Sequence, residues 1–376
     1  MVNPVKRIII SGGGTGGHIF PAVSIANALV RLMPNIEILF VGAKGRMEMD
    51  KVPAAGYKII GLDIQGINRK SLVKNLLLPF KLWKSIRQSE KIIDDFKPDA
   101  VVGVGGYASG PLLHAAGKKH IPYLIQEQNS FAGITNKKLG KKAAKICVAF
   151  DGMDKFFPAE KILFTGNPIR RDTVAIAGKD FEAKELLGLD QQKKTILLTG
   201  GSLGARTLNT CMLEGLEKLR DEEVQVIWQC GSFYYEQLAG LLKEQSWDHV
   251  CLKSFLHRMD LAYAAADMII ARAGAGTIAE LCAIGKPVVL VPSPNVAEDH
   301  QTKNALALTK KRAAIMVTDA DAPHKLIDTA LALIHDKDQC KELAANIKQL
   351  TKWDADEMIA KEVLKLADRK RQSESK

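Results

Sequence analysis

The sequence predicts an α/β fold with two Rossmann-like domains, each built on a doubly wound parallel sheet. Its 376 residues are too many for one ordinary domain and comfortable for two. Short β-branched runs alternate with helical patterns, which is typical of parallel sheets covered on both faces. Two stretches are alike, each a strand followed by a Gly-rich turn and a helix: "KRIIISGGGTGG" from Lys6 and "KTILLTGGSLGA" from Lys194.

The predicted elements fall into two series. Strands are expected at 5–10, 36–41, 57–61, 99–104, 121–125 and 145–149, and then at 195–199, 224–229, 249–253, 267–271, 287–291 and 313–317. Helical patterns lie between them, as at 21–33 and 205–218. We predict domains over 1–166 and 167–350, with "FTGNPIRRD" (164–172) as the hinge, and a C-terminal helix over 351–376 that packs back on the first domain.

Composition narrows the class of protein. With 47% hydrophobic and 25% charged residues the chain is typical of soluble globular proteins, and no apolar run is long enough to cross a membrane. A net charge of +11 favours anionic partners such as nucleic acid, phosphorylated ligands or acidic lipid surfaces, without choosing among them. The 6 cysteines form no C-x-x-C pair, which argues against a zinc site or a disulfide framework and suits a reducing cytosol.

A Gly-rich loop, "SGGGTGGHIFPA" (11–22), follows the first predicted strand. Gly12, Gly14 and Gly17 fit the G-x-G-x-x-G spacing of a dinucleotide fingerprint, but no acid ends the second strand to hold a ribose. Three interpretations stay open: a tight turn that needs small residues, a loop that binds phosphate or sugar, and an NAD(P) site. His18 opens the next helix, where it can act as a base or hydrogen-bond partner, or merely cap the helix.

Two further polar turns follow predicted strands. "GGSLGAR" (200–206) can offer a phosphate the N–H groups of a helix start and the hydroxyl of Ser202, or it is a simple tight turn. "QEQNSFAGITNK" (126–137) suits the recognition of sugar hydroxyls, or it is a plain polar turn. Its clustered amides are Gln126, Gln128 and Asn129.

Residues 271–305 contain the densest group of candidate site residues. Thr277 and Glu280 fit a capping box, which the local pattern favours over a ribose contact by Glu280. Further on, His300 and Gln301 belong to a row of polar side chains that can form hydrogen bonds with sugar hydroxyls or lie in an ordinary solvated loop.

No metal site is expected. Asp319 with Asp321, and Asp354 with Asp356, match the Asp-x-Asp of metal-dependent sugar transferases that have another architecture. Both pairs lie near predicted helix starts, where aspartate commonly caps, so we expect caps.

Residues 69–88, "RKSLVKNLLLPFKLWKSIRQ", form a basic amphipathic segment that is interrupted or restarted at Pro79. Its apolar side consists of Leu72, Leu76, Phe80 and Trp83. Its basic side includes Lys70, Lys74 and Lys81. Such a segment can lie in a membrane interface and attract anionic lipid, or it is a core helix with a solvated lysine face.

Seven motifs in one order are more specific than any of them alone: "GGGTGGHIFPA", "VGGYASGP", "EQNSFAGITNK", "FTGNPIR", "GGSLGAR", "AGTIAEL" and "AEDHQTKNA". Together they resemble the bacterial MurG-type glycosyltransferases of peptidoglycan synthesis, glycosyltransferase family 28, over about residues 6–310. The resemblance implies a GT-B fold, whose two Rossmann-like domains face a central cleft. The first domain would bind the acceptor and the membrane, and the second UDP-N-acetylglucosamine (UDP-GlcNAc).

The implied reaction moves GlcNAc from UDP-GlcNAc to the 4-hydroxyl of MurNAc in lipid I, an undecaprenyl-linked acceptor, and forms lipid II with inversion of configuration. The resemblance implies no metal, no cofactor and no nucleic acid. It implies a peripheral protein on the cytoplasmic face of the inner membrane, where anionic lipid and proteins of the cell-wall synthesis machinery are further partners.

Carried over residue by residue, the resemblance places Glu280 on the ribose, the backbone of Leu256 on the uracil, and Gln301 with His300 on the sugar. The whole implied UDP-GlcNAc set is Thr15, Gly16, Gly17, Asn129, Arg170, Ser202, Leu256, Ala275, Gly276, Thr277, Glu280, His300 and Gln301. Gly14 and Tyr107 fall on the acceptor side, and His18 is our candidate for the catalytic base.

The sequence departs from the family pattern at Leu203 and His300, where glutamine often stands, and this affects a phosphate and a sugar contact. The alternatives are another UDP-sugar transferase or an epimerase of the same fold, an NAD(P) oxidoreductase, and a basic membrane-binding module without enzymatic activity.

Overall fold

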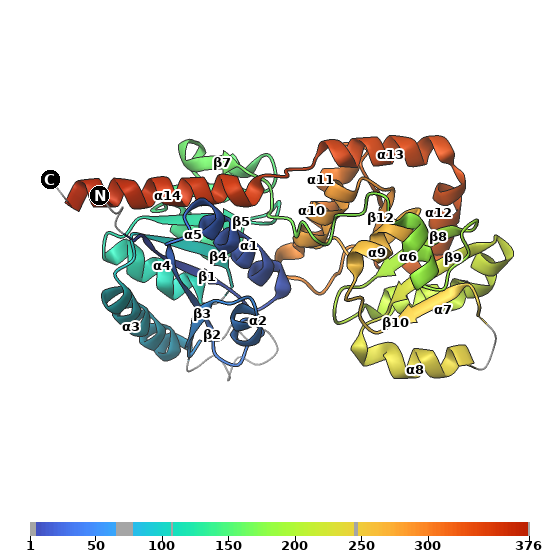
Figure 1. Cartoon of the computed structure of the whole chain (residues 1–376), viewed down its shortest axis with the longest axis horizontal. Coiled ribbons are helices and arrows are strands. Elements are labelled where there is room, and N and C mark those ends of the chain that lie inside the picture. Colours follow the sequence, from blue (N-terminus) through green and yellow to red (C-terminus); the bar gives the residue numbers. More distant parts are fainter. Residues whose placement is uncertain (1–4, 65–77, 107, 244–246, 375–376) are drawn as a thin grey trace. The chain divides into compact units, whose positions relative to one another are not determined.

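The structure, a computed structural model, describes residues 5–64, 78–106, 108–243 and 247–374. It divides into two compact units (Figure 1). Unit 1 runs to Ile169 and also takes in the segment from Lys352 onward, whereas unit 2 is Arg170–Thr351. Unit 2 is therefore inserted, in sequence, between two parts of unit 1.

Unit 1 is built on a seven-stranded parallel sheet of order β3-β2-β1-β4-β5-β6-β7. Its strands are β1 (Arg7–Gly12), β2 (Glu37–Ala43), β3 (Lys58–Leu62), β4 (Ala100–Gly105), β5 (Tyr123–Glu127), β6 (Lys145–Val148) and β7 (Ile162–Phe164). The strand order reverses between β1 and β4. The loops that follow these two strands therefore lie at the switch point, where open α/β sheets bind their ligands.

Helices cover both faces of this sheet. They are α1 (Gly16–Leu32), α2 (Glu48–Ala54), α3 (Leu78–Phe96), α4 (Ser109–Lys118), α5 (Ile134–Gly140) and α14 (Ala355–Glu374), with the short 3-10 helices η2 (Met153–Lys155) and η3 (Ala159–Lys161). Side chains alternate across β1: Ile8 and Ile10 pack with buried residues of α1 and α14, whereas Ile9 packs with those of α3 and α4. A continuous β-branched run thus serves two cores.

Unit 2 repeats this plan with a six-stranded parallel sheet of order β10-β9-β8-β11-β12-β13. Its strands are β8 (Lys194–Thr199), β9 (Val224–Gln229), β10 (Val250–Lys253), β11 (Met268–Ala271), β12 (Val288–Leu290) and β13 (Ile315–Met316). The order reverses between β8 and β11, so the loops after these strands form the switch point of unit 2.

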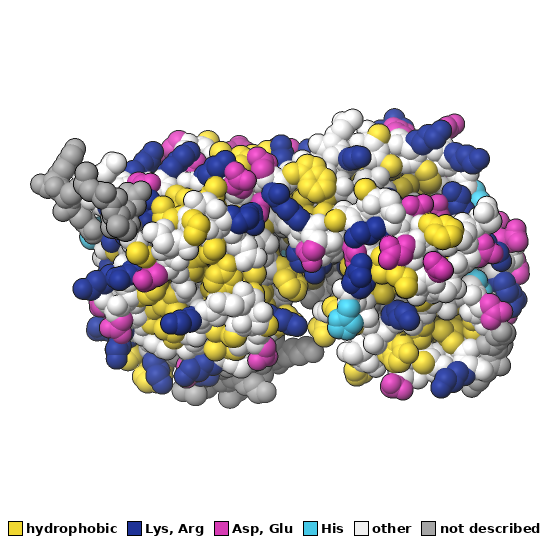
Figure 2. Space-filling view, in the orientation of Figure 1, with side chains coloured by type: hydrophobic (Ala, Val, Ile, Leu, Met, Phe, Trp, Pro, Cys, Tyr) yellow, Lys and Arg dark blue, Asp and Glu magenta, His cyan; other side chains and the backbone are white. Residues whose placement is uncertain are grey.

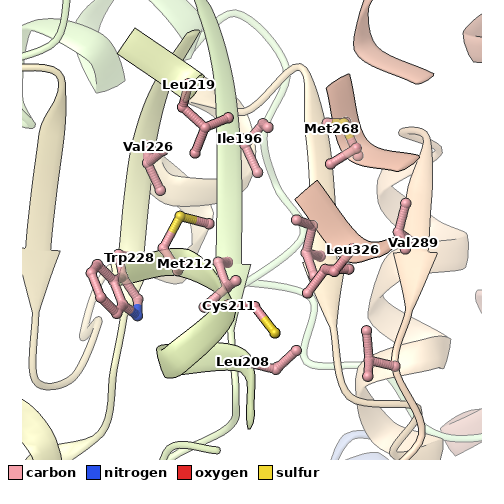
Figure 3. Packing of buried hydrophobic residues seen from close by; sticks show 14 of the residues in the cluster. Ile196, Leu208, Cys211, Met212, Leu219, Val226, Trp228, Met268, Val289 and Leu326 are labelled. Carbon is pink, nitrogen blue, oxygen red and sulfur yellow. The ribbon is translucent and has the colours of Figure 1, made fainter. Parts of the chain in front are cut away.

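The helices of unit 2 are α6 (Asp180–Leu186), α7 (Arg206–Asp221), α8 (Ser232–Lys243), α9 (Met259–Ala265), α10 (Ala275–Ile284), η4 (Ala297–Asp299), α11 (His300–Thr309), α12 (Ala322–His335) and α13 (Lys337–Gln349). Figure 3 shows part of the core, in which Trp228 of β9 lies near Met212 of α7 and Leu326 comes from α12. Trp228 is fully buried, and its indole N–H donates to the side chain of Asn209 at 3.0 Å.

The predicted fold class, α/β with two Rossmann-like doubly wound domains, is confirmed. Each predicted strand coincides with a strand of the structure to within two residues. Sequence patterns missed β7, because three residues are too few for a recognisable β-branched run. They also placed the start of α1 at Pro21, whereas the helix begins at Gly16 and contains that proline.

The surface carries both signs of charge. On the face shown in Figure 2, Lys and Arg side chains are interspersed with Asp and Glu over both units, so the net charge of +11 is not gathered there. Among the described residues, none of the helices is long and apolar enough to span a bilayer.

Candidate active site

In unit 1, the loop after β1 wraps around a buried carboxylate. Glu48, the first residue of α2, is 1% exposed. Its Oε2 accepts a hydrogen bond from the N–H of Gly14 at 2.8 Å, and its Oε1 accepts one from the N–H of Ala43 at 3.0 Å. A Cβ atom at Gly13 would overlap this carboxylate. Gly13 therefore makes room for a group of the protein itself.

His18 lies in the first turn of α1 with a defined orientation. Its Nδ1 is 3.0 Å from the carbonyl oxygen of Gly13 and 3.4 Å from Oγ1 of Thr15. Because a carbonyl only accepts, this contact assigns the proton to Nδ1 and leaves Nε2 as the basic nitrogen of the neutral ring. Gly105, with φ +101°, leaves space for the ring, since a Cβ there would stand 2.6 Å from Cδ2 of His18. A general base that acts through Nε2 needs this tautomer.

The predicted loop residues meet at the start of α1. Thr15 is the N-cap residue, and Gly16 and Gly17 are the first two residues of the helix. The N–H groups of a first helical turn have no partner within the helix and attract anions. The structure thus gathers Gly14, Thr15, Gly16, Gly17 and His18 at one junction between strand and helix.

The amide cluster after β5 is only partly accessible. Gln126 and Gln128 are buried. Gln126 donates to Oδ1 of Asn167 at 2.9 Å, and Gln128 donates to a main-chain carbonyl and to the Gln126 side chain. The interpretation of these two amides as sugar-reading groups is therefore wrong. Asn129 is partly exposed, and its N–H donates to the buried carboxylate of Glu127 at 3.2 Å.

Several predicted residues of unit 1 fall on parts of the chain that the structure leaves undescribed. They are Tyr107 on the acceptor side, and Lys70, Leu72, Lys74 and Leu76 in the amphipathic segment.

The described end of the amphipathic segment exposes two aromatic rings on α3. Phe80 is 63% exposed and Trp83 56%, and their ring centroids lie 6.1 Å apart. The guanidinium of Arg87 lies 5.7 Å from the Trp83 ring centroid, and Nζ of Lys81 lies 3.9 Å from a carboxylate oxygen of Asp63. The alternative of a core helix is therefore wrong for Phe80 and Trp83.

In unit 2, the turn after β8 exposes Ser202. Gln229, at the end of β9, supports this turn: its Nε2 donates to the carbonyl of Gly201 and to Oγ1 of Thr199, each at 3.1 Å. Its Oε1 accepts from the N–H of Leu256 at 2.9 Å. Gln229 thus links the predicted phosphate loop to the predicted uracil residue. The N–H of Leu256 is therefore engaged within the protein.

The first turn of α10 follows β11 at the switch point. The helix starts at Ala275 with Gly274 as its N-cap residue, so Gly276 and Thr277 lie inside the first turn. The predicted capping box, with Thr277 as cap and Glu280 reaching back to it, is wrong. This first turn comes shortly after the end of β11, and the N–H groups at the start of a helix can bind an anion.

Glu280 belongs to a buried polar cluster of unit 2. It is 8% exposed, and its Oε1 accepts from Nε of Arg170 at 2.8 Å and lies 2.7 Å from Nη2. Tyr263, itself buried, donates its hydroxyl to Oε2 at 3.1 Å. Burial raises the pKa of Glu280, and the Arg170 guanidinium opposes this rise. The structure therefore brings two predicted residues together, and Tyr263 joins them.

The sugar-side prediction falls at the start of α11. Glu298 and Asp299 have φ +56° and +51°, so the chain turns sharply before His300, the first residue of the helix. Oε1 of Gln301 accepts from the N–H of Ser293 at 2.8 Å, which leaves the amide NH₂ group to donate. Both predicted residues are partly exposed.

The prediction that the Asp-x-Asp side chains cap helices is wrong for three of the aspartates. Asp319 pairs with Nη1 of Arg272 at 2.5 Å, and Asp356 pairs with Nη2 of Arg31 at 2.6 Å. Asp321 is the N-cap residue of α12, but its side chain makes no cap hydrogen bond. Among the residues that the structure describes, no group of three or more His, Cys, Asp or Glu could hold a metal ion.

Sequence patterns missed three residues that organise these loops: Glu48, Gln229 and Tyr263. Glu48 lies five residues beyond the end of β2, whereas the fingerprint pattern led us to look for an acid only at the end of that strand. No local signal marks Gln229 or Tyr263, because their partners are distant in sequence.

Comparisons with known proteins agree with this fold. The sequence matches the glycosyltransferase family 28 N-terminal domain over residues 8–148 and the family 28 C-terminal domain over 195–359. The chain belongs to glycosyltransferase family 28.

Relatives match over almost their whole length. A protein of Parabacteroides distasonis is 56% identical over 97% of this chain and 99% of the relative, and one of Bacteroides fragilis is 55% identical over 96% of each. Both are named UDP-N-acetylglucosamine–N-acetylmuramyl-(pentapeptide) pyrophosphoryl-undecaprenol N-acetylglucosamine transferase. The crystal structure of Acinetobacter baumannii MurG matches with a TM-score of 0.78 and 30% identity, over 96% of this chain and 99% of that one.

Proposed function

We propose that this glycosyltransferase moves GlcNAc from UDP-GlcNAc to the 4-hydroxyl of MurNAc in lipid I, with inversion at the anomeric carbon, and so forms lipid II. The observation that carries the proposal is the 56% identity to a relative whose name states this donor and acceptor, over nearly the full length of both chains. The polar groups at the two switch points support it, because a nucleotide sugar and a hydroxyl acceptor need groups of these kinds.

In this proposal, unit 2 binds the donor. The hydroxyl of Ser202 and the first turns of α7 and α10 bind the diphosphate, and Glu280 accepts hydrogen bonds from the ribose hydroxyls. The carbonyl of Leu256 meets the uracil edge. The amide NH₂ of Gln301 donates to a GlcNAc hydroxyl, and His300 binds beside it.

Departure of UDP is the step that unit 2 assists. As the bond between the anomeric carbon and UDP breaks, negative charge grows on the diphosphate. A helix start carries roughly half a positive elementary charge, and the N–H groups of Ala275, Gly276 and Thr277 belong to such a start. Because these dipoles are fixed before the reaction, they stabilise the developing charge without reorganising.

Unit 1 supplies the base and receives the acceptor. Nε2 of His18 takes the proton of the 4-hydroxyl as its oxygen attacks the anomeric carbon and UDP leaves. The ring then carries a positive charge, and its Nδ1–H bond to the Gly13 carbonyl strengthens. Thr15, Gly16, Gly17 and Asn129 approach the transferred sugar, and Gly14 and Tyr107 the acceptor.

The transfer assay tests the proposal directly. Purified protein is incubated with UDP-GlcNAc and a short-chain lipid I analogue, and UDP release is measured. We expect release that depends on the acceptor. His18→Ala should lower turnover by about 10²–10⁴-fold, the usual contribution of a general base, and leave donor affinity unchanged. His114→Ala, which removes an exposed histidine of the same unit, is the control. Near-normal turnover of His18→Ala would contradict the role of the base.

We also propose that the protein is peripheral on the cytoplasmic face of the membrane, where its acceptor and the proteins of cell-wall synthesis lie. The exposed rings of Phe80 and Trp83 support this, since aromatic side chains insert at the level of the lipid headgroups. Lys81 and Arg87 are close to them on α3 and would attract anionic lipid.

Vesicle binding tests this second proposal. Phe80→Glu with Trp83→Glu should weaken binding to vesicles of phosphatidylglycerol and phosphatidylcholine and leave turnover of a soluble acceptor unchanged. Phe181→Glu is the matched control, because Phe181 is 64% exposed but lies on α6 of unit 2. Equal vesicle binding by the double variant and by the control would contradict the role of the two rings.

A further inference from the structure

Glu48 and His18 bind to opposite ends of one peptide group. The Gly13 carbonyl that accepts from Nδ1 of His18 at 3.0 Å, and the Gly14 N–H that donates to Oε2 of Glu48 at 2.8 Å, belong to the same peptide. We propose that Glu48 is a positioning residue for His18 and acts through this peptide. The inference rests on the proposed function, in which His18 takes the proton of the acceptor hydroxyl.

The physical basis is polarisation of the peptide. A hydrogen bond to a carboxylate is charge-assisted and pulls electron density toward the carbonyl end of the peptide that donates it. Bonds in such a chain strengthen one another by about 10–30% each. The Gly13 carbonyl becomes a stronger acceptor, so the His18 tautomer with a proton on Nδ1 is favoured and Nε2 stays basic. Serine hydrolases place a carboxylate directly on the imidazole, whereas here one peptide lies between them.

The surroundings fix each member of this chain of hydrogen bonds. The second carboxylate oxygen of Glu48 is held by Ala43 at the end of β2. A Cβ at Gly42 would stand 2.6 Å from Cγ of Glu48, and one at Gly106 would overlap the Gly13 carbonyl oxygen. Glycine at these positions lets the carboxylate and the peptide approach each other.

If Glu48 only stabilised the loop, its two hydrogen bonds would be explained, but removing its charge would have no effect on the tautomer of His18. A carboxylate that is 1% exposed is costly to bury, and its two N–H partners offset that cost. The distinguishing quantity is therefore the tautomer of His18. The amide of Glu48→Gln keeps the shape of the side chain but loses the charge that polarises the peptide, and its single oxygen can accept from Gly14 or from Ala43 but not from both.

The experiment compares wild type with Glu48→Gln by nitrogen-15 NMR of histidine-labelled full-length protein at alkaline pH, where the ring is neutral. The His18 signals are assigned by their absence in His18→Ala. We expect wild-type His18 to carry its proton on Nδ1 and Glu48→Gln to shift the ring toward the Nε2–H form. Turnover should fall about ten-fold, a part of the ~10²–10⁴-fold effect of a general base, with the KM for UDP-GlcNAc unchanged.

Two controls separate positioning from stability. Asp99→Asn removes another buried carboxylate of unit 1, which precedes β4 at the other end of the strand and pairs with Arg371. It should leave the His18 tautomer unchanged, even if stability falls. In a His18→Ala background, Glu48→Gln should cause no further loss of turnover, because its effect passes through the imidazole.

The outcomes are distinct. A wild-type His18 with its proton on Nε2 overturns the inference without any variant, so a failure of Glu48→Gln to fold does not leave it untested. An unchanged tautomer in a folded Glu48→Gln protein overturns it as well. A shifted tautomer together with normal turnover of His18→Ala supports the positioning by Glu48 and overturns the proposed base.

Discussion

Replacing Arg170 with alanine would leave the Glu280 carboxylate buried without its cation. Breaking a buried ion pair costs about 3–5 kcal/mol. The Arg170 side chain is 38% exposed, so water screens part of the attraction, and the hydroxyl of Tyr263 remains on Oε2. We therefore expect a loss of about 2 kcal/mol in the free energy of unfolding of unit 2, or about 30-fold in its equilibrium constant.

The loss should depend on pH in a defined direction. Burial raises the pKa of Glu280, and Arg170 lowers it, so the variant has a still higher pKa. A carboxyl whose pKa is raised on folding binds its proton more readily in the folded chain. Its contribution to stability therefore rises as pH falls through the folded pKa toward the lower pKa of the unfolded chain. Arg170→Ala should be most destabilised at neutral pH and recover part of the loss in acid.

Urea unfolding of the full chain measures this effect, with hydrogen exchange of peptides from β8 and β9 to report on unit 2. Adding Glu280→Gln to Arg170→Ala removes the buried charge and should restore most of the stability lost at neutral pH. Arg312→Ala breaks a pair in which the arginine side chain is 76% exposed, and should cost only about 0–1 kcal/mol. An equal loss at neutral and acid pH, or no restoration in the double variant, would refute the reasoning.

Three further outcomes are expected in unit 2. Gly204 has φ +76°, and a Cβ there would overlap a carbonyl oxygen, so Gly204→Ala should destabilise the protein by more than about 2 kcal/mol. Gly240 lies in open space on α8, so Gly240→Ala should stabilise the protein by about 0.5–1 kcal/mol. Thermal unfolding measures both changes. Tyr263→Phe removes a donor from Glu280 and should weaken UDP-GlcNAc binding by about five-fold in calorimetry, with the fold unchanged. Burial lowers the pKa of Lys286 to about 8, so between pH 8 and 10.5 the unfolded chain binds more protons than the folded one. The free energy of unfolding of the wild type, measured in urea, should therefore rise by up to about 3 kcal/mol over this range, relative to that of Lys286→Met.

The fold was predictable because its signals are local. Strands such as Ile8–Ile10 are continuous apolar runs, and both sheets bury such runs on two faces. The Gly-rich turns mark where strands pass into helices, so the positions of His18 and Ser202 at the carboxyl ends of strands followed from the pattern alone.

The partners within the site were not predictable, because they come from distant parts of the chain. Glu280 matched a capping box by its letters, yet it binds Arg170, 110 residues away. Glu48 binds Gly14 across 34 residues, and only the paired strands β1 and β2 bring the two together. A window of a few residues holds no information about such contacts.

The return of the chain to unit 1 sets the order of events during synthesis. α14 supplies Ile359, Ala360 and Val363 to the core that α1 also lines. Between Ile169 and Lys352 the ribosome must make the 182 residues of unit 2, Arg170 to Thr351. At about 5–20 residues per second this takes roughly 9–36 s. Until α14 has been made, its share of this core cannot form. The half of the protein that is translated first is thus the half that finishes folding last.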